Sequence, residues 1–464
     1  KDTIKMVKDF FIYEDLGEIN IKGKDTPECI FKIEQIKEQS EIDQKYKTPY
    51  IGREKELNSI HEIYAKYKIN SEPIGPKYIG IKAEAGIGKT RFIKELLNKI
   101  YKNKFSSNYC VSGYASNISK QPYQIFISLI KDYASISHLD DETSVKSKLR
   151  KLFDDLGGLL DYQISLNFES SLPIISFLLG VKVDDPRLND KGKGLQTHIQ
   201  ISLNLFIKAI ANKSNLSGLP LIIIVEDLHW VDSLSKSVIT YISQDSNFAD
   251  LDKKKKDDMI FIFSYRSSFD FNNTFKSIQL HEIILKPFNH KQSKLLINKY
   301  LQKNDIQAEK IEELLNKSEG NPFFIEQYLK LYTSASESFR ESEIPDNLNS
   351  LILSQIDKLG YNLKLVLQKA SVLGEKFYRL ILEIIENKLD SKISVNEIIS
   401  ELENSDLIYP DISVQDLYYF KHILTRDVAY NTILKSNKKI LHKLSAEIIE
   451  QNFQHSIENF YYDL

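Results

Sequence analysis

The letters A-E-A-G-I-G-K-T, beginning at Ala83, form a predicted phosphate-binding loop. Their spacing is G-x-x-x-x-G-K-S/T, except that Ala83 replaces the first glycine. Gly86 and Gly88 allow the backbone N–H groups to point at phosphate oxygens. Lys89 is then expected to reach the β and γ phosphates, and Thr90 to ligate Mg²⁺. The chemistry indicated is binding of ATP or ADP with Mg²⁺.

Two neighbouring carboxylates, Glu226 and Asp227, follow the unbroken apolar run Leu221 to Val225. Such a run is typical of a strand covered on both faces, and open α/β sheets bind ligands at the carboxyl ends of their strands. One carboxylate can hold Mg²⁺ through water, while the other orients or deprotonates the attacking water. We favour Glu226 for the metal and Asp227 for the base, with the reverse order left open. Acids here can also cap a helix, so this interpretation depends on the phosphate loop upstream.

Arg266 ends another buried strand, M-I-F-I-F-S-Y-R, which begins at Met259. A cation at that place can sense the γ-phosphate or stabilise charge that develops during phosphoryl transfer. The alternative is an arginine that is solvated at the end of a strand. The residues assigned to catalysis are Lys89, Glu226, Asp227 and Arg266.

The phosphate loop lies between two apolar patterns that can hold it in place. Tyr78, Ile79 and Ile81 precede it as a strand, and an amphipathic helix containing Phe92 and Leu96 follows it. This strand, loop and helix order is the one that a phosphate-binding loop requires.

Other elements of the same domain are predicted from shorter patterns. Residues 109–113 indicate a second strand, and residues 199–210 carry a helical apolar stripe. A helix that starts near Leu57, directly after Ile51-Gly52-Arg53, is suited to walling the adenine from one side. No pattern places residues 140–198 reliably.

The region after residue 289 is predicted to be mainly helical, with Gly320-Asn321-Pro322 ending one helix and starting the next. Short helices in residues 341–450, with a hairpin from 407–409 to 418–420, are the pattern of a winged helix. That segment has 13 Lys and Arg against 17 Asp and Glu. Because a wing that reads DNA should be basic, this one is predicted to face a protein or to regulate.

The N-terminal segment is predicted to be a hairpin with strands at 16–22 and 29–33, followed by a polar linker over 34–48. A hairpin this short cannot bury a core by itself. Since Lys1 begins in the middle of a pattern, we expect the chain to be a piece of a longer protein.

Composition limits the classes of protein that the chain can be. A length of 464 residues predicts two to four domains, and 42% hydrophobic residues are enough to fold them. A formal net charge of -2 disfavours nucleic acid as the main partner. Cys29 and Cys110 have no metal-like spacing and are expected to be free thiols in a reducing compartment. No apolar run is long enough to span a bilayer, so we expect a cytoplasmic protein without a membrane span.

Several motifs together resemble one known family. They are Y-I-G-R-E-K-E-L, A-E-A-G-I-G-K-T-R, I-I-I-V-E-D-L-H-W-V-D, F-S-Y-R, E-G-N-P-F-F and Y-F-K-H-I-L-T-R-D-V-A-Y, in this order over residues 50–450. This order resembles the STAND class of signal-transducing P-loop ATPases, in the branch that follows class III cyclase domains in soluble adenylyl cyclases. Residues 9–33 look like the last hairpin of such a cyclase domain.

The resemblance implies an α/β fold: a P-loop NTPase parallel sheet of the ASCE or AAA type, followed by a helical lid and a winged helix. The implied domains are the cyclase hairpin and linker at 1–48, the NTPase at 49–288, the lid at 289–340, the winged helix at 341–450, and the start of a helical region at 451–464. The implied contacts to ATP, ADP or Mg²⁺ come from Ile51, Gly52, Arg53, Ala85, Gly86, Ile87, Gly88, Lys89, Thr90, Arg91, Glu226, Pro322 and His422.

His422 has a role only through the resemblance, which implies that it contacts the β-phosphate of ADP from the winged helix. The plainer interpretation is a half-buried histidine bonded to nearby backbone. The implied partners are a cyclase domain upstream, whose catalytic residues lie outside these 464 residues, and proteins bound through the winged helix and C-terminal helices.

Three functions are compatible with these patterns. The first is an ATP/ADP-dependent switch with slow hydrolysis that regulates synthesis of cAMP or cGMP in the parent protein. The second is an ATP-dependent transcription regulator, which the acidic winged helix disfavours. The third is a scaffold that binds nucleotide without turnover.

Overall fold

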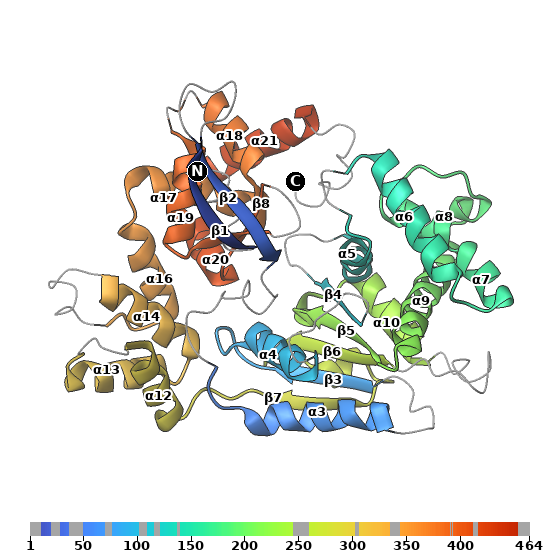
Figure 1. Cartoon of the computed structure of the whole chain (residues 1–464), viewed down its shortest axis with the longest axis horizontal. Coiled ribbons are helices and arrows are strands. Elements are labelled where there is room, and N and C mark those ends of the chain that lie inside the picture. Colours follow the sequence, from blue (N-terminus) through green and yellow to red (C-terminus); the bar gives the residue numbers. More distant parts are fainter. Residues whose placement is uncertain are drawn as a thin grey trace.

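The computed structural model shows an α/β core flanked by helical parts (Figure 1). The structure describes residues 11–19, 28–36, 50–69, 77–101, 109–115, 121–136, 140–244, 259–301, 306–334, 344–389, 391, 393–411 and 416–452. Among these residues no helix is long and apolar enough to cross a membrane. Cys110 is a free, buried thiol.

The centre of the molecule is a five-stranded parallel sheet in the order β4-β5-β6-β3-β7. Its strands are β3 (Lys77–Lys82), β4 (Cys110–Tyr114), β5 (Leu221–Glu226), β6 (Met259–Tyr265) and β7 (Leu280–Ile284). Strand β6 therefore separates the strand that leads into the phosphate loop from the strand that ends in the acids. The predicted P-loop NTPase sheet is confirmed. The sequence did not indicate β7, because this edge strand is largely exposed and has no continuous apolar run.

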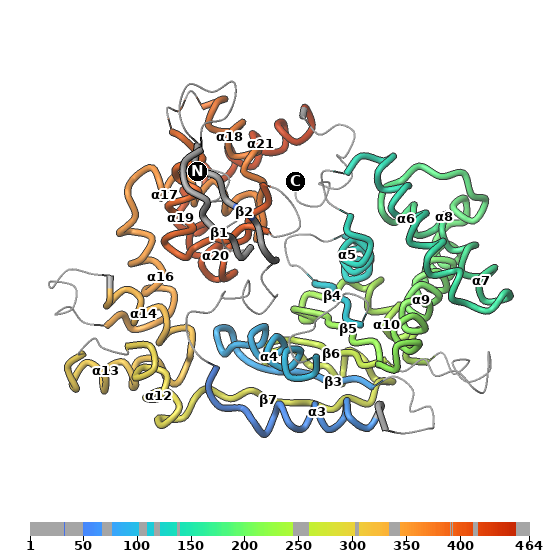
Figure 2. The backbone as a smooth tube through the Cα atoms, viewed as in Figure 1, coloured from blue at the N-terminus to red at the C-terminus, as the bar shows by residue number. Residues whose placement is uncertain are grey.

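The apolar runs form buried strands because their side chains alternate between two cores. In β5, Ile222 and Ile224 pack on the face covered by α3 (Glu54–Ile69) and α4 (Lys89–Tyr101). Leu221, Ile223 and Val225 pack on the opposite face. That second face is covered by α5 (Gln124–Tyr133), α9 (Lys193–Leu216) and α10 (Ser233–Gln244), as the tube view also shows (Figure 2). The helices on the two faces hold the sheet so that the carboxyl ends of its parallel strands lie along one edge.

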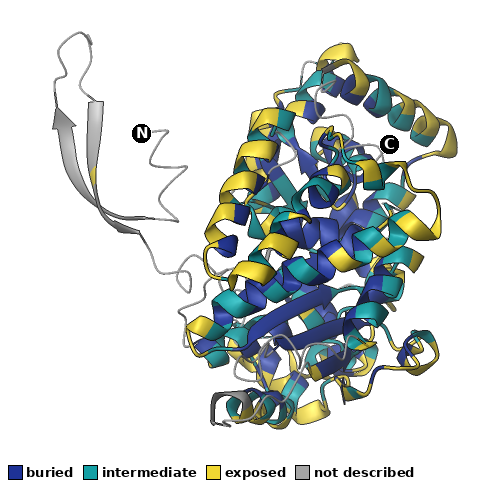
Figure 3. Cartoon of the chain, turned by 90° about the vertical axis from the view of Figure 1, so that its right-hand side faces the viewer, coloured by how far each residue is buried: buried dark blue, intermediate teal, exposed yellow. Residues whose placement is uncertain are grey.

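Residues 140–216 form a helical insertion between β4 and β5, in which the helical stripe predicted at 199–210 is confirmed and residues 140–198 had no prediction. It contains α6 (Glu142–Gly157), α7 (Tyr162–Glu169), α8 (Leu172–Leu178), the 3-10 turn η1 (Pro186–Asn189) and α9. Phe153 and Phe168 stack at 4.3 Å between ring centroids inside it. Buried inner faces and exposed outer faces of the helices are visible in Figure 3.

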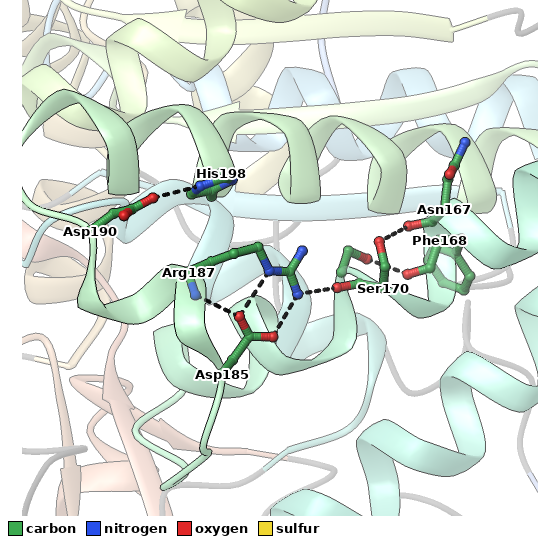
Figure 4. A network of polar contacts seen from close by, with 8 residues as sticks. Asn167, Phe168, Ser170, Asp185, Arg187, Asp190 and His198 are labelled. Carbon is green, nitrogen blue, oxygen red and sulfur yellow. Dashed lines mark hydrogen bonds and ion pairs between the residues drawn. The ribbon is translucent and has the colours of Figure 1, made fainter.

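Polar contacts stabilise the segment that connects α8 to α9 (Figure 4). Asp185 accepts hydrogen bonds from Nε of Arg187 at 2.9 Å and from its Nη2 at 2.7 Å. The same Nη2 donates to the carbonyl of Ser170 at 2.6 Å. His198 of α9 contacts Asp190 at 2.9 Å. These contacts lie away from the phosphate loop and hold the connection in shape.

Three helices follow the sheet and are called the lid helices here: α12 (His290–Leu301), α13 (Ala308–Ser318) and α14 (Pro322–Ser334). A short helix, α11 (Phe271–Thr274), precedes β7. The predicted break at Gly320-Asn321-Pro322 is confirmed. Gly320 has a φ of 74°, and a Cβ there would lie 2.0 Å from the carbonyl oxygen of Phe288, so this turn requires glycine.

The C-terminal module, residues 344–452, combines helices with a small antiparallel sheet in the order β8-β10-β9. Its elements are α16 (Leu348–Asp357), α17 (Tyr361–Leu373), β8 (Lys376–Tyr378), α18 (Arg379–Lys388), α19 (Val395–Asn404), β9 (Ile408–Pro410), β10 (Leu417–Phe420), α20 (Ile423–Asn431) and α21 (Lys435–Asn452). The predicted β9–β10 hairpin is confirmed, whereas β8 was not indicated by the sequence. Phe323 of α14 packs into the module's core and so ties it to the lid helices.

The N-terminal strands are β1 (Phe11–Ile19) and β2 (Glu28–Ile36), which pair antiparallel. The prediction of a hairpin is therefore confirmed, but both strands are longer than expected and β1 begins earlier. The pairing of β1 with β2 is irregular between Asp15 and Glu18. This irregularity interrupts the alternation of apolar and polar residues that predicted the first strand. The predicted turn, most of the linker at 34–48 and the segment 453–464 lie outside the described residues.

Candidate functional site

A cavity of about 500 Å³ lies where the sheet, the lid helices and the C-terminal module meet. All the predicted site residues except Gly52 line it. They come from segments as distant in sequence as Ile51 and His422, so the fold brings them together. Gly52 instead makes a turn with a φ of 69°, where a Cβ would lie 2.5 Å from Nε2 of Gln292.

The phosphate loop has the backbone shape that its glycines predict. Gly86 and Gly88 have φ values of 81° and 94°, which side chains rarely allow. Lys89 Nζ donates to the loop carbonyls of Ala83 at 3.1 Å and Glu84 at 3.3 Å. Burial lowers the pKa of the Lys89 ammonium, and the charge of Asp227 opposes that change. The loop therefore holds this cation against its own carbonyl groups.

Thr90 and Glu226 supply oxygen donors of the kind that Mg²⁺ prefers. The Thr90 hydroxyl donates to Oε2 of Glu226 at 2.9 Å. The two oxygens therefore lie side by side between the loop and the end of β5. Mg²⁺ bound with a nucleotide needs only one or two protein oxygens, because phosphates and water complete its shell. These two residues fit that requirement. Bound there, the ion would neutralise charge on the phosphates.

Asp227 is held by its backbone and leaves its carboxylate facing the cavity. Its φ of 53° is left-handed, an uncommon conformation for this residue type. Its N–H donates to the hydroxyl of Ser264 at 3.2 Å. Burial raises the pKa of the Asp227 carboxyl, while the charges of Lys89 and Arg266 counteract this. Arg266, which directly follows β6, thus lies close enough to act on the acids electrostatically.

The side of the cavity opposite the acids is formed by residues before the phosphate loop. Arg53 is only 8% exposed and donates from Nη2 to the carbonyl of Ile87 at 2.8 Å. Its guanidinium lies over the ring of Phe288, 5.3 Å from the centroid. Ile51 packs into the core of the lid helices. Arg91 makes an ion pair of 3.2 Å with Glu326 of α14. These contacts fasten the loop to the lid helices.

The turn that precedes α14 touches the phosphate loop directly. Asn321 Nδ2 donates to the carbonyl of Ala85 at 3.1 Å, while its Oδ1 accepts from the N–H of Phe323 and caps α14. A Cβ on Gly86 would lie 2.8 Å from Asn321 Oδ1, so glycine is also required for this close approach. Pro322 lines the cavity as the first residue of α14. Movement of the loop would therefore be transmitted to the lid helices.

The C-terminal module closes the cavity with His422 and Glu375. The His422 ring lies 3.9 Å from the Phe323 ring between centroids, and burial lowers its pKa to about 3. Glu375 lines the cavity as an exposed residue, and loss of solvent around its carboxyl raises its pKa to about 7, with the charges of Asp227 and Glu226 adding to the effect. Lys376 Nζ donates to the Tyr114 hydroxyl at 3.2 Å, directly linking the module to β4.

Three residues in contact with this site were not assigned a role from the sequence. The sequence predicts Asn321 only as part of a helix break. Its position between Gly320 and Pro322 could also have indicated a role in the site. Ser264 is a polar residue inside a buried strand next to an arginine, which is a weaker signal. Glu375 has no local signal, because its position depends on how the C-terminal module docks.

The sheet order, the glycine loop and the paired acids define a P-loop ATPase domain. Residues 49–249 match the family described as the AAA ATPase domain. This match covers less than half of the chain and ends before β6 and the lid helices.

Comparison with curated proteins gives one distant relative. An uncharacterized protein of Rhizobium meliloti (strain 1021) is 20% identical over 461 residues, which are 95% of this chain and 41% of the relative. The chain thus spans about two fifths of that relative's length.

Similar solved structures include a STAND protein with a tetratricopeptide repeat sensor from Pyrococcus horikoshii. It is 15% identical with a TM-score of 0.46, covering 89% of this chain and 48% of that one. The ORC2 protein of Aeropyrum pernix, in ADPNP and ADP complexes, is 9% identical with a TM-score of 0.38, covering 89% and 98%. Cdc6p of Pyrobaculum aerophilum is 13% identical with a TM-score of 0.36, covering 87% and 98%.

Proposed function

We propose that this chain is an ATP/ADP-dependent switch of the STAND type, in which the bound nucleotide controls the contact between the ATPase domain and the C-terminal module. The observation that carries this proposal is the shared cavity. Its lining includes the phosphate loop, the acids that end β5, Pro322 of the lid and His422 of the C-terminal module. A ligand bound to the loop would touch both sides of the interface, so its identity can alter their packing.

The site's own residues suit slow ATP hydrolysis. Lys89 would hold the β and γ phosphates, and Thr90 with Glu226 would hold the Mg²⁺ shell. Asp227 would accept the proton of the attacking water, since burial raises its pKa toward that of a base. Arg266 would stabilise negative charge that develops on the transferred group.

His422 suits the detection of ADP from the module's side. Burial keeps its imidazole neutral at pH 7, because its pKa is lowered to about 3. A neutral ring has one N–H, which can donate to a phosphate oxygen. In this proposal residues 49–288 form the ATPase, 289–340 the lid and 341–450 a winged helix that reports the nucleotide state.

The switch is further proposed to regulate a class III nucleotidyl cyclase in a longer parent protein. This step rests on the order of motifs and on the likeness of residues 9–33 to the end of a cyclase domain. The catalytic residues of that cyclase would lie upstream. Cyclic nucleotide synthesis by the parent, compared between wild type and Lys89→Ala, would test it.

The experiment for the chain itself pairs binding with single-turnover hydrolysis. ATP-Mg and ADP are titrated by calorimetry, and conversion of radiolabelled ATP is followed with protein in excess. Binding with slow conversion is expected. Binding with no conversion in the wild type would favour the nucleotide-locked scaffold, and absence of binding would overturn the proposal. A pair of fluorophores on α6 and α18 would report whether ADP and an ATP analogue give different distances.

A further inference from the structure

His229 is a buried polar residue that the catalytic scheme above leaves without a role. It lies in the 3-10 turn η2 (Leu228–Trp230), which follows β5, and its side chain is 7% exposed. Neither ring nitrogen has a hydrogen-bond partner within the described part of the chain. Because buried polar groups in folded proteins are nearly always paired, a histidine with two unpaired nitrogens beside the paired acids indicates a hydrogen bond that is not formed in this state.

The imidazole of His229 is a neutral hydrogen-bond donor at physiological pH. Burial lowers its pKa to about 4, and the positive charges of Arg266 and Lys89 act in the same direction. A neutral imidazole has one N–H and one acceptor nitrogen. The Trp230 ring lies 5.0 Å from the His229 ring between centroids and limits its movement on one side.

The nearest acid to this donor is Asp227. Nδ1 of His229 and Oδ1 of Asp227 are 3.8 Å apart, which is too far for a hydrogen bond but within reach of a side-chain rotation. The backbone of Asp227 is fixed on both sides, because its N–H donates to Ser264 and its carbonyl accepts from Trp230 at 2.9 Å. The carboxylate, 47% exposed toward the cavity, is therefore the part of Asp227 that can move.

We propose that His229 is a positioning residue for phosphoryl transfer: when Mg²⁺ and ATP occupy the cavity, its Nδ1–H donates to Asp227 and fixes the carboxylate toward the attacking water. This inference rests on the proposed ATPase function. The hydrogen bond would satisfy the unpaired donor and leave the second carboxylate oxygen free to accept the water's proton. In the state described here the bond is open, so the base is not yet oriented.

The kinetic test uses variants that separate the donor from the ring. His229→Phe keeps a ring but removes both nitrogens, whereas the amide of His229→Asn can donate from near the Nδ1 position. His229→Phe should slow single-turnover hydrolysis about 10- to 100-fold with ATP affinity unchanged, as expected for a residue that orients a catalytic group. His229→Asn should retain most of the rate. In an Asp227→Asn background, His229→Phe should cause no further loss, because it acts through Asp227.

Full activity of a folded His229→Phe variant would overturn the proposal, as would equal losses in the Phe and Asn variants. A further loss in the Asp227→Asn background would show that His229 acts by another route and would also overturn it. His198→Asn, a histidine variant outside the cavity, is the matched control and should match wild type in rate.

A second test observes the hydrogen bond without hydrolysis. In wild-type protein labelled with ¹⁵N-histidine, the His229 ring signals are assigned by their absence from His229→Asn. After addition of Mg²⁺ and a non-hydrolysable ATP analogue, Nδ1 should carry the proton. An unprotonated Nδ1 in the loaded protein overturns the inference whatever rates the variants show. If the analogue does not bind, or wild type binds ATP without converting it, the ATPase function itself has failed, which is a different result.

Discussion

The hydroxyl of Thr90 donates a hydrogen bond of 2.9 Å to Oε2 of Glu226, joining the phosphate loop to the end of β5. Asp227, one residue later, instead turns into a left-handed conformation and faces Lys89 and Arg266. The two neighbouring acids thus have different surroundings. This difference supports the metal shell for Glu226 and the base for Asp227, the order that the sequence favoured without excluding the reverse.

Lys89→Ala should abolish binding of ATP-Mg. Lys89 is the cation of the loop, and among the described residues its ammonium donates to the loop carbonyls of Ala83 and Glu84. Calorimetric titration measures the effect. Lys99→Ala, an exposed position in the last turn of α4, is the matched control and should bind as wild type does. Unchanged affinity in Lys89→Ala would contradict the assignment of the phosphate loop.

Glu226→Gln and Asp227→Asn should differ in which step they impair. Glu226→Gln should raise the Mg²⁺ concentration needed for half-maximal hydrolysis, because a ligand of the metal shell is lost. Asp227→Asn should bind ATP-Mg normally but reduce the single-turnover rate by a factor on the order of 10² to 10⁴, the usual contribution of a general base. Magnesium titrations of single-turnover rates separate the two effects. The opposite pattern would reverse the roles of the two acids.

Glu375 should make docking of the C-terminal module depend on pH. Its ordinary pKa of 4.5 is raised to about 7 by burial, with Asp227 and Glu226 adding to the rise and Lys376 opposing it. The docked state therefore favours the protonated carboxyl, and its stability falls as the pH rises from 4.5 through 7. Without nucleotide and with EDTA, the thermal midpoint of wild type should drop across this range more than that of Glu375→Gln.

The control for this pH dependence is Glu401→Gln on the exposed face of α19. It should keep the wild-type slope between pH 5 and 8. Parallel curves for wild type and Glu375→Gln would mean that the carboxyl of Glu375 is not held near the acids of β5 in solution.

The local motifs could be predicted because their chemistry is contained in a few consecutive residues. Gly86, Gly88 and Lys89 have functions set by backbone freedom and charge at fixed spacing, and β5 is recognised by an unbroken apolar run. The gathering of distant motifs around one cavity followed from the family resemblance rather than from any single pattern.

Other features depend on tertiary structure and leave little trace in the sequence. Helix α7 spans only 8 residues, which is too short for a clear helical period. The edge strand β7 is exposed, so alternation and apolar runs fail there. Glu375 enters the site because the C-terminal module packs beside β4, and no neighbouring residue in the sequence indicates that contact. Gly52 makes a left-handed turn beside Gln292, and its predicted contact with the nucleotide stays a prediction.

The chain should not bind duplex DNA. Residues 341–450 have four more acids than bases, so the module would repel phosphates rather than release counterions. Fluorescence anisotropy with a labelled duplex, at two salt concentrations, is the measurement. Submicromolar binding that weakens with salt would contradict this prediction and would support the hypothesis that the protein is a transcription regulator.

His422→Ala should weaken binding of ADP more than binding of ATP. The ring faces Phe323 at the edge of the cavity, and its neutral imidazole can donate to a β-phosphate when no γ-phosphate holds the module away. Loss of one hydrogen bond to a charged oxygen should cost about 1 to 3 kcal/mol in ADP affinity. Paired calorimetric titrations with ADP and ATP-Mg give both values. His442→Ala in α21 is the matched control, because that ring bonds to Tyr430 outside the cavity. Equal losses for both nucleotides, or no loss, would leave His422 with a structural role at the Phe323 contact only.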